Sequence, residues 1–245
     1  MELAGRVAVV TGGAGGLGEF IVSRLLAEGC QVVAADVEPG AWAAREDGSI
    51  AFCRADVRVA ADVERMVGFA VDRFGGLDVL VNNAGGVSRG AQWPSASASE
   101  WRATLELNLL GPMLATQLAL EPMRARGGGA VVNIASSAGV EWTPYSSPEY
   151  GAAKAGLVRF TTAAGALSDI RINCIVPGWI GLERAYEERA AMSEAERAAA
   201  GPFVEPAAIA DAVVWLLRSD SLTGRVVEMP SGSERRFLGT GNEER

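Results

Sequence analysis

Lys154 is the single lysine of a chain whose other 21 basic residues are arginines. It follows Tyr150 by four positions in a stretch of helical composition, and residues four apart lie on the same face of a helix. A nearby ammonium group lowers the pKa of a phenol from its usual value of about 10. The spacing therefore predicts an acid–base pair that moves a proton at a substrate oxygen. The alternative is an ordinary pair of side chains on a helix surface.

The composition excludes several other kinds of catalytic chemistry. The chain has no histidine, so Ser-His-Asp catalysis, Cys-His catalysis and histidine-ligated metal sites are impossible. The three cysteines, Cys30, Cys53 and Cys174, lie far apart and show no CxxC spacing. We expect them to be small buried hydrophobic residues in a reducing compartment, and we expect no bound metal.

A glycine-rich segment, Thr11–Gly18, lies between a predicted strand and a predicted helix. Glycines in such a connection allow a tight turn and a close approach of the backbone to a ligand, and a helix N-terminus favours a pyrophosphate. This context predicts a dinucleotide site. Its cofactor contacts are expected to include Gly12, Gly15, Gly16, Leu17 and Gly18. The alternative is a glycine-rich connection that binds no ligand.

Asp36 stands at the end of the second predicted strand, about twenty residues after the glycine-rich segment. A carboxylate at this place can accept hydrogen bonds from both hydroxyl groups of an adenosine ribose, and it repels a 2′-phosphate. Val37 follows it, and the glycine-rich segment contains no basic residue. The sequence therefore predicts NAD rather than NADP as the cofactor, unless Asp36 only begins a turn.

Short apolar runs alternate with longer amphipathic segments along the whole chain. The runs are rich in β-branched residues and lack polar alternation, as expected for strands covered on both faces. This order predicts one doubly wound, Rossmann-type α/β domain over residues 1–245, with a seven-stranded parallel sheet flanked by helices. The predicted strands are 6–10, 31–36, 50–53, 78–81, 130–134, 171–176 and 225–229, and the predicted helices are 16–28, 60–74, 99–126, 150–168 and 206–218.

Residues 182–200 are rich in Ala, Glu and Arg and follow a predicted strand end, where ligands bind in folds of this kind. The segment is predicted to be either a lid over the substrate or a surface helix.

The net charge of −8 and the lack of long basic runs argue against a nucleic acid partner. No signal-peptide pattern opens the chain, and no apolar run approaches the roughly eighteen residues of a membrane span. We expect a soluble cytoplasmic protein with no membrane partner.

Together these motifs resemble those of the short-chain dehydrogenase/reductase family, and the resemblance extends over essentially all 245 residues. The matching segments occur in the family's order: Thr11–Gly18, Asp56-Val57, Asn82–Gly85, Asn108, Ser136, Tyr150 with Lys154, and Asn173–Gly178. The family implies an oxidoreductase with a nicotinamide cofactor. It also implies a homotetramer or homodimer, in which the helices near 99–126 and 150–168 pack across subunits.

The resemblance implies a role for each matched residue. Tyr150 would transfer the proton, and Lys154 would make that transfer easier and hold the nicotinamide ribose. Ser136 would bind the reacting oxygen, and Asn108 would anchor a water for proton relay. Further cofactor contacts would come from Asp56, Val57, Asn82, Ala84, Gly85, Pro177 and Ile180. Asn82–Gly85 could also brace the central strand by hydrogen bonds.

The position of the catalytic serine departs from the family pattern. Ser136 lies fourteen residues before Tyr150, one more than is usual, so counting back from Tyr150 selects Ser137 instead. We prefer Ser136, which follows the predicted strand at the expected distance, and we place the extra residue in the loop 141–148.

Two further departures concern the cofactor and the C-terminus. Leu182 stands where the family usually has a threonine that binds the carboxamide, so the nicotinamide would rely on backbone groups such as that of Ile180. Met229–Gly232 replaces the usual Asp-Gly-Gly near the last strand, which alters the expected C-terminal tail.

Aromatic residues and a proline near the strand ends suggest an apolar or cyclic substrate; they are Trp93, Trp142, Pro144, Tyr145 and Trp179. The alternative is that they fill the core or subunit contacts.

The leading interpretation is an NAD-dependent oxidoreductase that interconverts a secondary alcohol and its ketone, with Tyr150 as the acid/base. A non-catalytic dinucleotide-binding regulator or scaffold is a second possibility, although a scaffold needs no acid–base pair. A lyase, epimerase or dehydratase that uses bound NAD is a third.

Overall fold

The computed structural model describes residues 1–45, 48–87, 90–142 and 147–239. One sheet runs through it in the order β3-β2-β1-β4-β5-β6-β7-β8. Its strands are β1 Val7–Thr11, β2 Gln31–Asp36, β3 Ile50–Arg54, β4 Val79–Asn82, β5 Gly129–Ile134, β6 Ile170–Pro177, β7 Val226–Met229 and β8 Arg236–Phe237. The predicted single α/β domain with a parallel sheet is confirmed.

The sheet has eight strands rather than the seven predicted. The additional strand, β8, pairs antiparallel with β7. It follows the altered segment Met229–Gly232, in which Gly232 adopts a φ of 73° that favours glycine. The chain therefore turns back along the sheet edge, in the segment whose tail was expected to differ from the family pattern.

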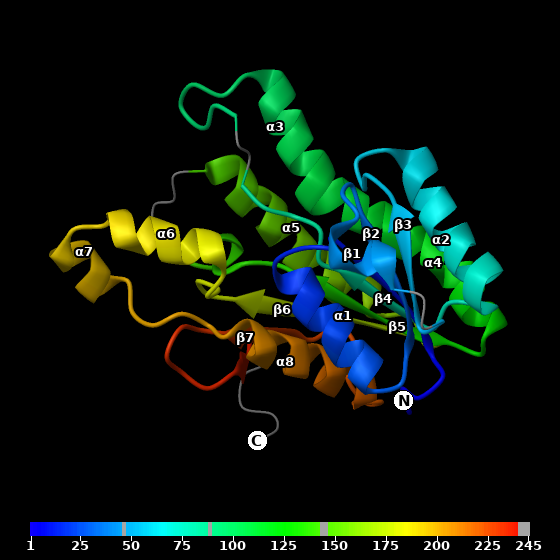
Figure 1. The fold of residues 1–245 in the computed structure, drawn as a ribbon. Helices are drawn as coiled ribbons and strands as arrows, with labels where there is room; N and C mark the ends of the chain where they lie inside the picture. Colours follow the sequence, from blue (N-terminus) through cyan, green and yellow to red (C-terminus); the bar gives the residue numbers. More distant parts are fainter. Residues whose placement is uncertain (46–47, 88–89, 143–146, 240–245) are drawn as a thin grey trace.

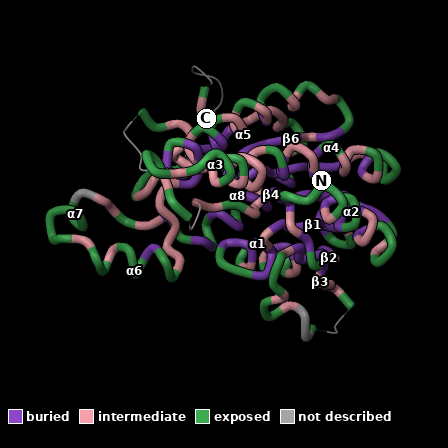
Figure 2. The backbone as a smooth tube through the Cα atoms, turned by 90° about the horizontal axis from the view of Figure 1, so that it is seen from above, coloured by how far each residue is buried: buried purple, intermediate pink, exposed green. Residues whose placement is uncertain are grey.

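Helices cover both faces of the sheet (Figure 1). They are α1 Leu17–Ala27, α2 Ala60–Phe74, α3 Ala98–Leu105, α4 Gly111–Ala125, α5 Pro148–Ala164, α6 Glu183–Ala191, α7 Glu194–Ala199 and α8 Pro206–Arg218, with short turns η1 Gly40–Ala44, η2 Glu106–Leu110 and η3 Ser137–Gly139. On β1, Ala8 and Val10 pack with α1 and α8, whereas Val7 and Val9 pack with α2 and α4. This two-sided burial explains why the strands read as unbroken apolar runs. Figure 2 shows the buried strands at the centre and α7 exposed at the periphery.

The order of the strands fixes where a ligand can bind. From β1 the chain adds β2 and β3 on one side, and then crosses to add β4 to β7 on the other. Between β1 and β4 the connections therefore leave in opposite directions. This opens a crevice at the carboxyl ends of these strands, the usual binding place in sheets of this kind.

Asp78, at the start of β4, ties three elements together. Its side chain is 1% exposed and accepts hydrogen bonds from the Val7 amide (2.9 Å), from Arg6 (2.8 Å) and from Arg126 beyond α4 (3.1 Å). Burial alone would raise the pKa of Asp78, but these hydrogen bonds outweigh it and hold the pKa below its usual value.

We expect Asp78→Asn to lower the free energy of unfolding by about 3 kcal/mol near pH 7, because two arginines lose a buried partner. The stabilisation is present above the ordinary aspartate pKa of about 4 and is lost as the pH falls through the lowered pKa of the folded state. Urea unfolding of both proteins at pH 7 and pH 3 measures this. Asp169→Asn, which removes the exposed partner of Arg124, is the matched control and should cost less than about 1 kcal/mol. Equal losses in the two variants would contradict the assignment.

Candidate active site

The glycine-rich turn leads from β1 into α1 with its backbone closely packed. Gly12 has a φ of 62°, and a Cβ atom on Gly18 would lie 1.8 Å from the Gly12 carbonyl oxygen, so no side chain fits there. A Cβ atom on Gly15, by contrast, would meet no atom within 4 Å. The side-chain amide nitrogen of Asn83 donates to the backbone carbonyls of Thr11 (3.0 Å) and Gly12 (3.1 Å). The turn thus offers an open, immobilised stretch of backbone at the start of α1.

Asp36 ends β2 beside this turn. Its carboxylate accepts hydrogen bonds from the backbone amides of Ala14 (3.0 Å) and Val37 (2.7 Å). Each carboxylate oxygen has more than one acceptor direction, so both can still accept a bond from a ligand hydroxyl.

Asp56 and Arg58 form a local ion pair near the same end of the sheet. The Arg58 guanidinium binds both carboxylate oxygens of Asp56, at distances from 2.6 to 3.1 Å. These hydrogen bonds hold the pKa of Asp56 below its usual value. The positive charge of Arg58 is therefore matched within the protein.

Tyr150 and Lys154 lie on consecutive turns of α5, as the sequence predicts for this spacing. The Lys154 side chain is buried, donates to the carbonyl oxygen of Ile134 (2.9 Å) and lies 5.7 Å from the centre of the Tyr150 ring. Burial lowers the pKa of Lys154 from 10.5 to about 8. The ammonium group is thus placed beside the phenol, away from bulk water.

Asn108 lies in η2, a single turn of π-helix that interrupts the predicted helix 99–126 between α3 and α4. The irregularity has a local cause, because Pro112 has no amide to donate to the carbonyl of Asn108. The Gly111 amide instead bonds to Glu106, five residues back. The Asn108 side chain accepts from the Gly86 amide (2.9 Å) and donates to the Gly86 carbonyl (3.0 Å), which fixes the backbone after β4.

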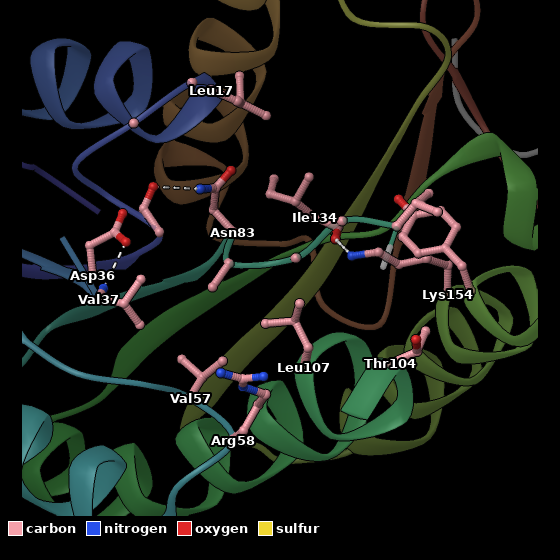
Figure 3. A pocket seen from close by; sticks show the side chains of 18 of the residues that line it. Leu17, Asp36, Val37, Val57, Arg58, Asn83, Thr104, Leu107, Ile134 and Lys154 are labelled. Carbon is pink, nitrogen blue, oxygen red and sulfur yellow. Dashed lines mark hydrogen bonds between the residues drawn. The ribbon is translucent and has the colours of Figure 1, made fainter. Parts of the chain in front are cut away.

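These elements enclose one side of a cavity of about 780 Å³. Asp36 lies near one end and Lys154 near the other, with Asn83 and Ile134 between them (Figure 3). Asp36, Asn83 and Ile134 follow the order of β2, β4 and β5 in the sheet, and Lys154 of α5 is held at Ile134. Volume and length suit an elongated ligand of two connected halves.

Eleven of the residues predicted for the site line this cavity: Gly12, Gly15, Gly16, Leu17, Asp36, Val57, Ala84, Gly85, Tyr150, Lys154 and Ile180. Six do not: Gly18, Asp56, Asn82, Asn108, Ser136 and Pro177. Gly18 and Asn108 hold the backbone segments that line the cavity. Ser136 accepts a hydrogen bond from the Ala138 amide at the start of η3 (3.3 Å). Asn82 donates to Pro112, Thr116 and Asn133, which is the bracing role weighed for this motif.

Comparison with known proteins agrees with this arrangement. The family model described as short chain dehydrogenase matches residues 6–192. The chain belongs to this family. It is 39% identical over 228 residues to cis-4-hydroxycyclohexanecarboxylate dehydrogenase of Sinomonas cyclohexanicum, covering 87% of this chain and 89% of that protein. It is 35% identical over 227 residues to 2,5-dichloro-2,5-cyclohexadiene-1,4-diol dehydrogenase of Sphingobium indicum, covering 88% and 91%. A solved structure of ElxO with NADP bound superposes with a TM-score of 0.82 at 26% identity, covering 93% and 98%.

Short-chain dehydrogenases use a nicotinamide dinucleotide, and this cavity fits one. The space above Gly15 is open, the turn ends at a helix N-terminus, and Asp36 and Lys154 offer an acceptor and a donor near opposite ends. Within the described part of the chain, no group of three or more Cys, Asp and Glu side chains could hold a metal ion. In the same residues no helix is long and apolar enough to cross a membrane.

Several lining residues were not among the predicted site residues, and they include Asn83, Arg58, Thr104 and Leu107. Asn83 belongs to the recognised Asn82–Gly85 motif. Because the strand ends at Asn82, the alternation of its side chains does not indicate which of the two asparagines faces the cavity. Thr104 lies two residues before η2 and Leu107 lies within it, and this irregular turn changes the direction in which their side chains point from that of a regular helix.

The three tryptophans expected around the substrate do not line this cavity. Trp142 is fully exposed, Trp93 packs against Trp101, and Trp179 packs edge-on against Phe203 at 4.7 Å. None of these three tryptophans lines the cavity as the described residues define it. Pro144 and Tyr145 lie outside the described residues. The three cysteines are buried and unpaired, as predicted.

Proposed function

We propose that the protein is an NAD-dependent oxidoreductase that interconverts a secondary alcohol and its ketone on an apolar or cyclic small molecule. One observation carries the proposal: Tyr150 and Lys154 line the same cavity as the glycine-rich turn and Asp36. A dinucleotide bound along the turn would end at the acid–base pair. A regulator or scaffold would gain nothing from the burial of an ammonium beside that phenol, since such burial costs free energy.

The mechanism assigns each group one task. When bound, the nicotinamide accepts or supplies the hydride. Tyr150 takes the proton from the alcohol oxygen or returns it to the ketone oxygen. Lys154, held by the Ile134 carbonyl, stabilises the deprotonated phenol by its charge. Ser136 is the proposed hydrogen-bond partner of the reacting oxygen, and Asn108 positions the Gly85-Gly86 backbone opposite Lys154.

The preference for NAD is proposed from the adenosine end of the cavity. The structure with NADP bound belongs to a relative of 26% identity. In this chain Asp36 lies beside the turn, and the nearest lining cation, Arg58, is neutralised by Asp56. A carboxylate in this place repels a 2′-phosphate and accepts bonds from ribose hydroxyls.

The substrate class is proposed from two sources. The names of the two relatives above specify ring alcohols, a cyclohexanecarboxylate and a cyclohexadienediol. In this chain the lining includes the apolar side chains of Ala103, Leu107 and Leu182. We propose that α6 and α7, which follow Leu182, form a lid over the substrate. We also propose that the enzyme is cytoplasmic.

We also propose a homotetramer, in which α3, α4 and α5 pack across subunits. The exposed side chains of Trp101 on α3 and Leu110 on η2 support this, since exposed large apolar side chains can mark an interface.

Titration of the protein with NADH and NADPH tests the proposed cofactor. We expect NADH to bind more tightly. Asp36→Ala should weaken the binding of NADH by about 30-fold, because hydrogen bonds to a charged group are lost. The binding of NADPH should not weaken, because the carboxylate that repels its 2′-phosphate is gone. Asp211→Ala, which removes an exposed carboxylate on α8, is the matched control. An unchanged ratio of the two dissociation constants in Asp36→Ala would exclude contact between Asp36 and the ribose. If wild-type protein bound neither nucleotide, the proposed function would be wrong.

A further inference from the structure

The segment that follows β2 folds back onto the glycine-rich turn. Gly40, with a φ of 52°, lies so close to the turn that a Cβ atom on it would be 2.2 Å from the Ala14 carbonyl oxygen. Two residues later, the indole nitrogen of Trp42 donates to the Gly13 carbonyl oxygen at 2.8 Å. The rest of the Trp42 ring is partly buried against the core between the sheet and α1. Gly13 and Ala14 are therefore buried beside η1, whereas Gly12 lines the cavity.

The peptide unit between Gly13 and Ala14 is consequently held at both of its polar ends. Its carbonyl accepts from Trp42, and its amide donates to Asp36 at 3.0 Å. The preceding amide, of Gly13, donates to the Ala35 carbonyl on β2 at 3.2 Å. A Cβ atom on Gly13 would also lie 3.1 Å from the Ala34 Cα atom, so the turn already touches the strand. Because its position depends on the same peptide, the Asp36 carboxylate is fixed by Trp42 through one intervening group.

We infer that Trp42 is a positioning residue that sets the discrimination between NAD and NADP, an inference that rests on the proposed function. A carboxylate excludes a 2′-phosphate only if it cannot swing away and the backbone beside it cannot retreat, since either movement makes room for the phosphate. Asp36 supplies the negative charge. The hydrogen bond from Trp42 and the close contact of Gly40 prevent the turn backbone and the Asp36 carboxylate from moving away. The Trp42 ring itself does not line the cavity, so it acts through the turn and not by contact with the nucleotide.

Trp42→Phe tests the inference, because phenylalanine keeps an aromatic ring and removes the N–H donor. We expect the dissociation constant for NADH to rise by about fivefold, as for the loss of one hydrogen bond. The dissociation constant for NADPH should not rise, because a carboxylate and a backbone that can move make room for the 2′-phosphate. In the ligand-free protein, the Ala14 amide should exchange with deuterium about fivefold faster, because the peptide is held at one end only. Trp215→Phe is the matched control, since that indole packs against Phe237 and Arg235 away from the turn; it should change neither quantity.

The outcomes separate this inference from the proposed function. If the ratio of the dissociation constants for NADH and NADPH is unchanged in Trp42→Phe, the role of Trp42 is overturned even if wild-type protein prefers NADH. Unchanged exchange at Ala14 overturns it as well, because the peptide would then not depend on the indole. If wild-type protein binds neither nucleotide, the proposed function is overturned together with the inference, whatever the exchange rates show.

Discussion

Replacement of Tyr150 by phenylalanine is expected to lower kcat by about 10³-fold while the dissociation constant for NADH stays within about twofold of the wild-type value. The change removes one oxygen atom and leaves the ring against Lys154. If the phenol is the acid/base, the proton at the substrate oxygen then has no nearby acceptor. If Tyr150 only packs against the cavity, kcat changes little.

The measurement is single-turnover and steady-state oxidation of a panel of cyclic secondary alcohols, together with titration of NADH by fluorescence. Ser219→Ala is the control, because it also removes one hydroxyl oxygen, from a residue at the end of α8 that does not line the cavity. It should retain kcat within a few-fold. A Tyr150→Phe protein that turns over at the wild-type rate would exclude the assigned acid/base, while unchanged NADH affinity would leave the cofactor site intact.

The fold could be predicted from the sequence because its strands are buried on both faces. Residues such as Val9 and Val10 must both be apolar when α2 covers one face and α1 the other. Glycine placement was equally informative, since Gly18 is dictated by a contact with Gly12 only a few residues away. Such short-range requirements leave a mark in the local sequence.

Features that depend on distant contacts left no such mark. The strand β8 forms because Arg236 and Phe237 pair with β7 and Arg236 forms an ion pair with Glu228, eight positions earlier. Trp42 reads as one more apolar residue in a loop until its indole is seen beside Gly13, 29 positions earlier. The same limit explains why the site prediction named Asn82 and not Asn83. Only the packing of β4 against β5 and α4 shows that the side-chain amide of Asn82 points toward those elements.

Lys154→Met is expected to lower kcat by about 10²-fold or more, and to weaken NADH, because the charge that stabilises the deprotonated phenol and the donor near the ribose are both lost. Methionine keeps a straight apolar side chain of similar length, so the buried space stays filled. Arg159→Met, on the same helix but exposed, removes a positive charge without these effects and is the control. Retained kcat and NADH affinity in Lys154→Met would contradict the role of the ammonium group.

The stability of the same two proteins gives an independent reading of the buried charge. The pKa of Lys154 falls from 10.5 to about 8 on folding, so between these values the unfolded chain binds more protons than the folded one. Wild-type stability should therefore rise, by a term of about 3 kcal/mol, as the pH increases from 8 toward 10.5. Below pH 8 the side chain is buried in its charged form, and the Ile134 carbonyl and the nearby Tyr150 ring offset part of the cost. Cys174, the neighbouring thiol, does not ionise in this range, because burial raises its pKa to about 12.

Lys154→Met has no ammonium group and lacks this pH dependence. The unfolding free energy of the variant minus that of wild type, measured in urea, should therefore be largest at pH 7 and smaller at pH 10. A difference that stays constant across this range would show that Lys154 is solvated in the folded protein. In that case it could not act on Tyr150 from a position shielded from water.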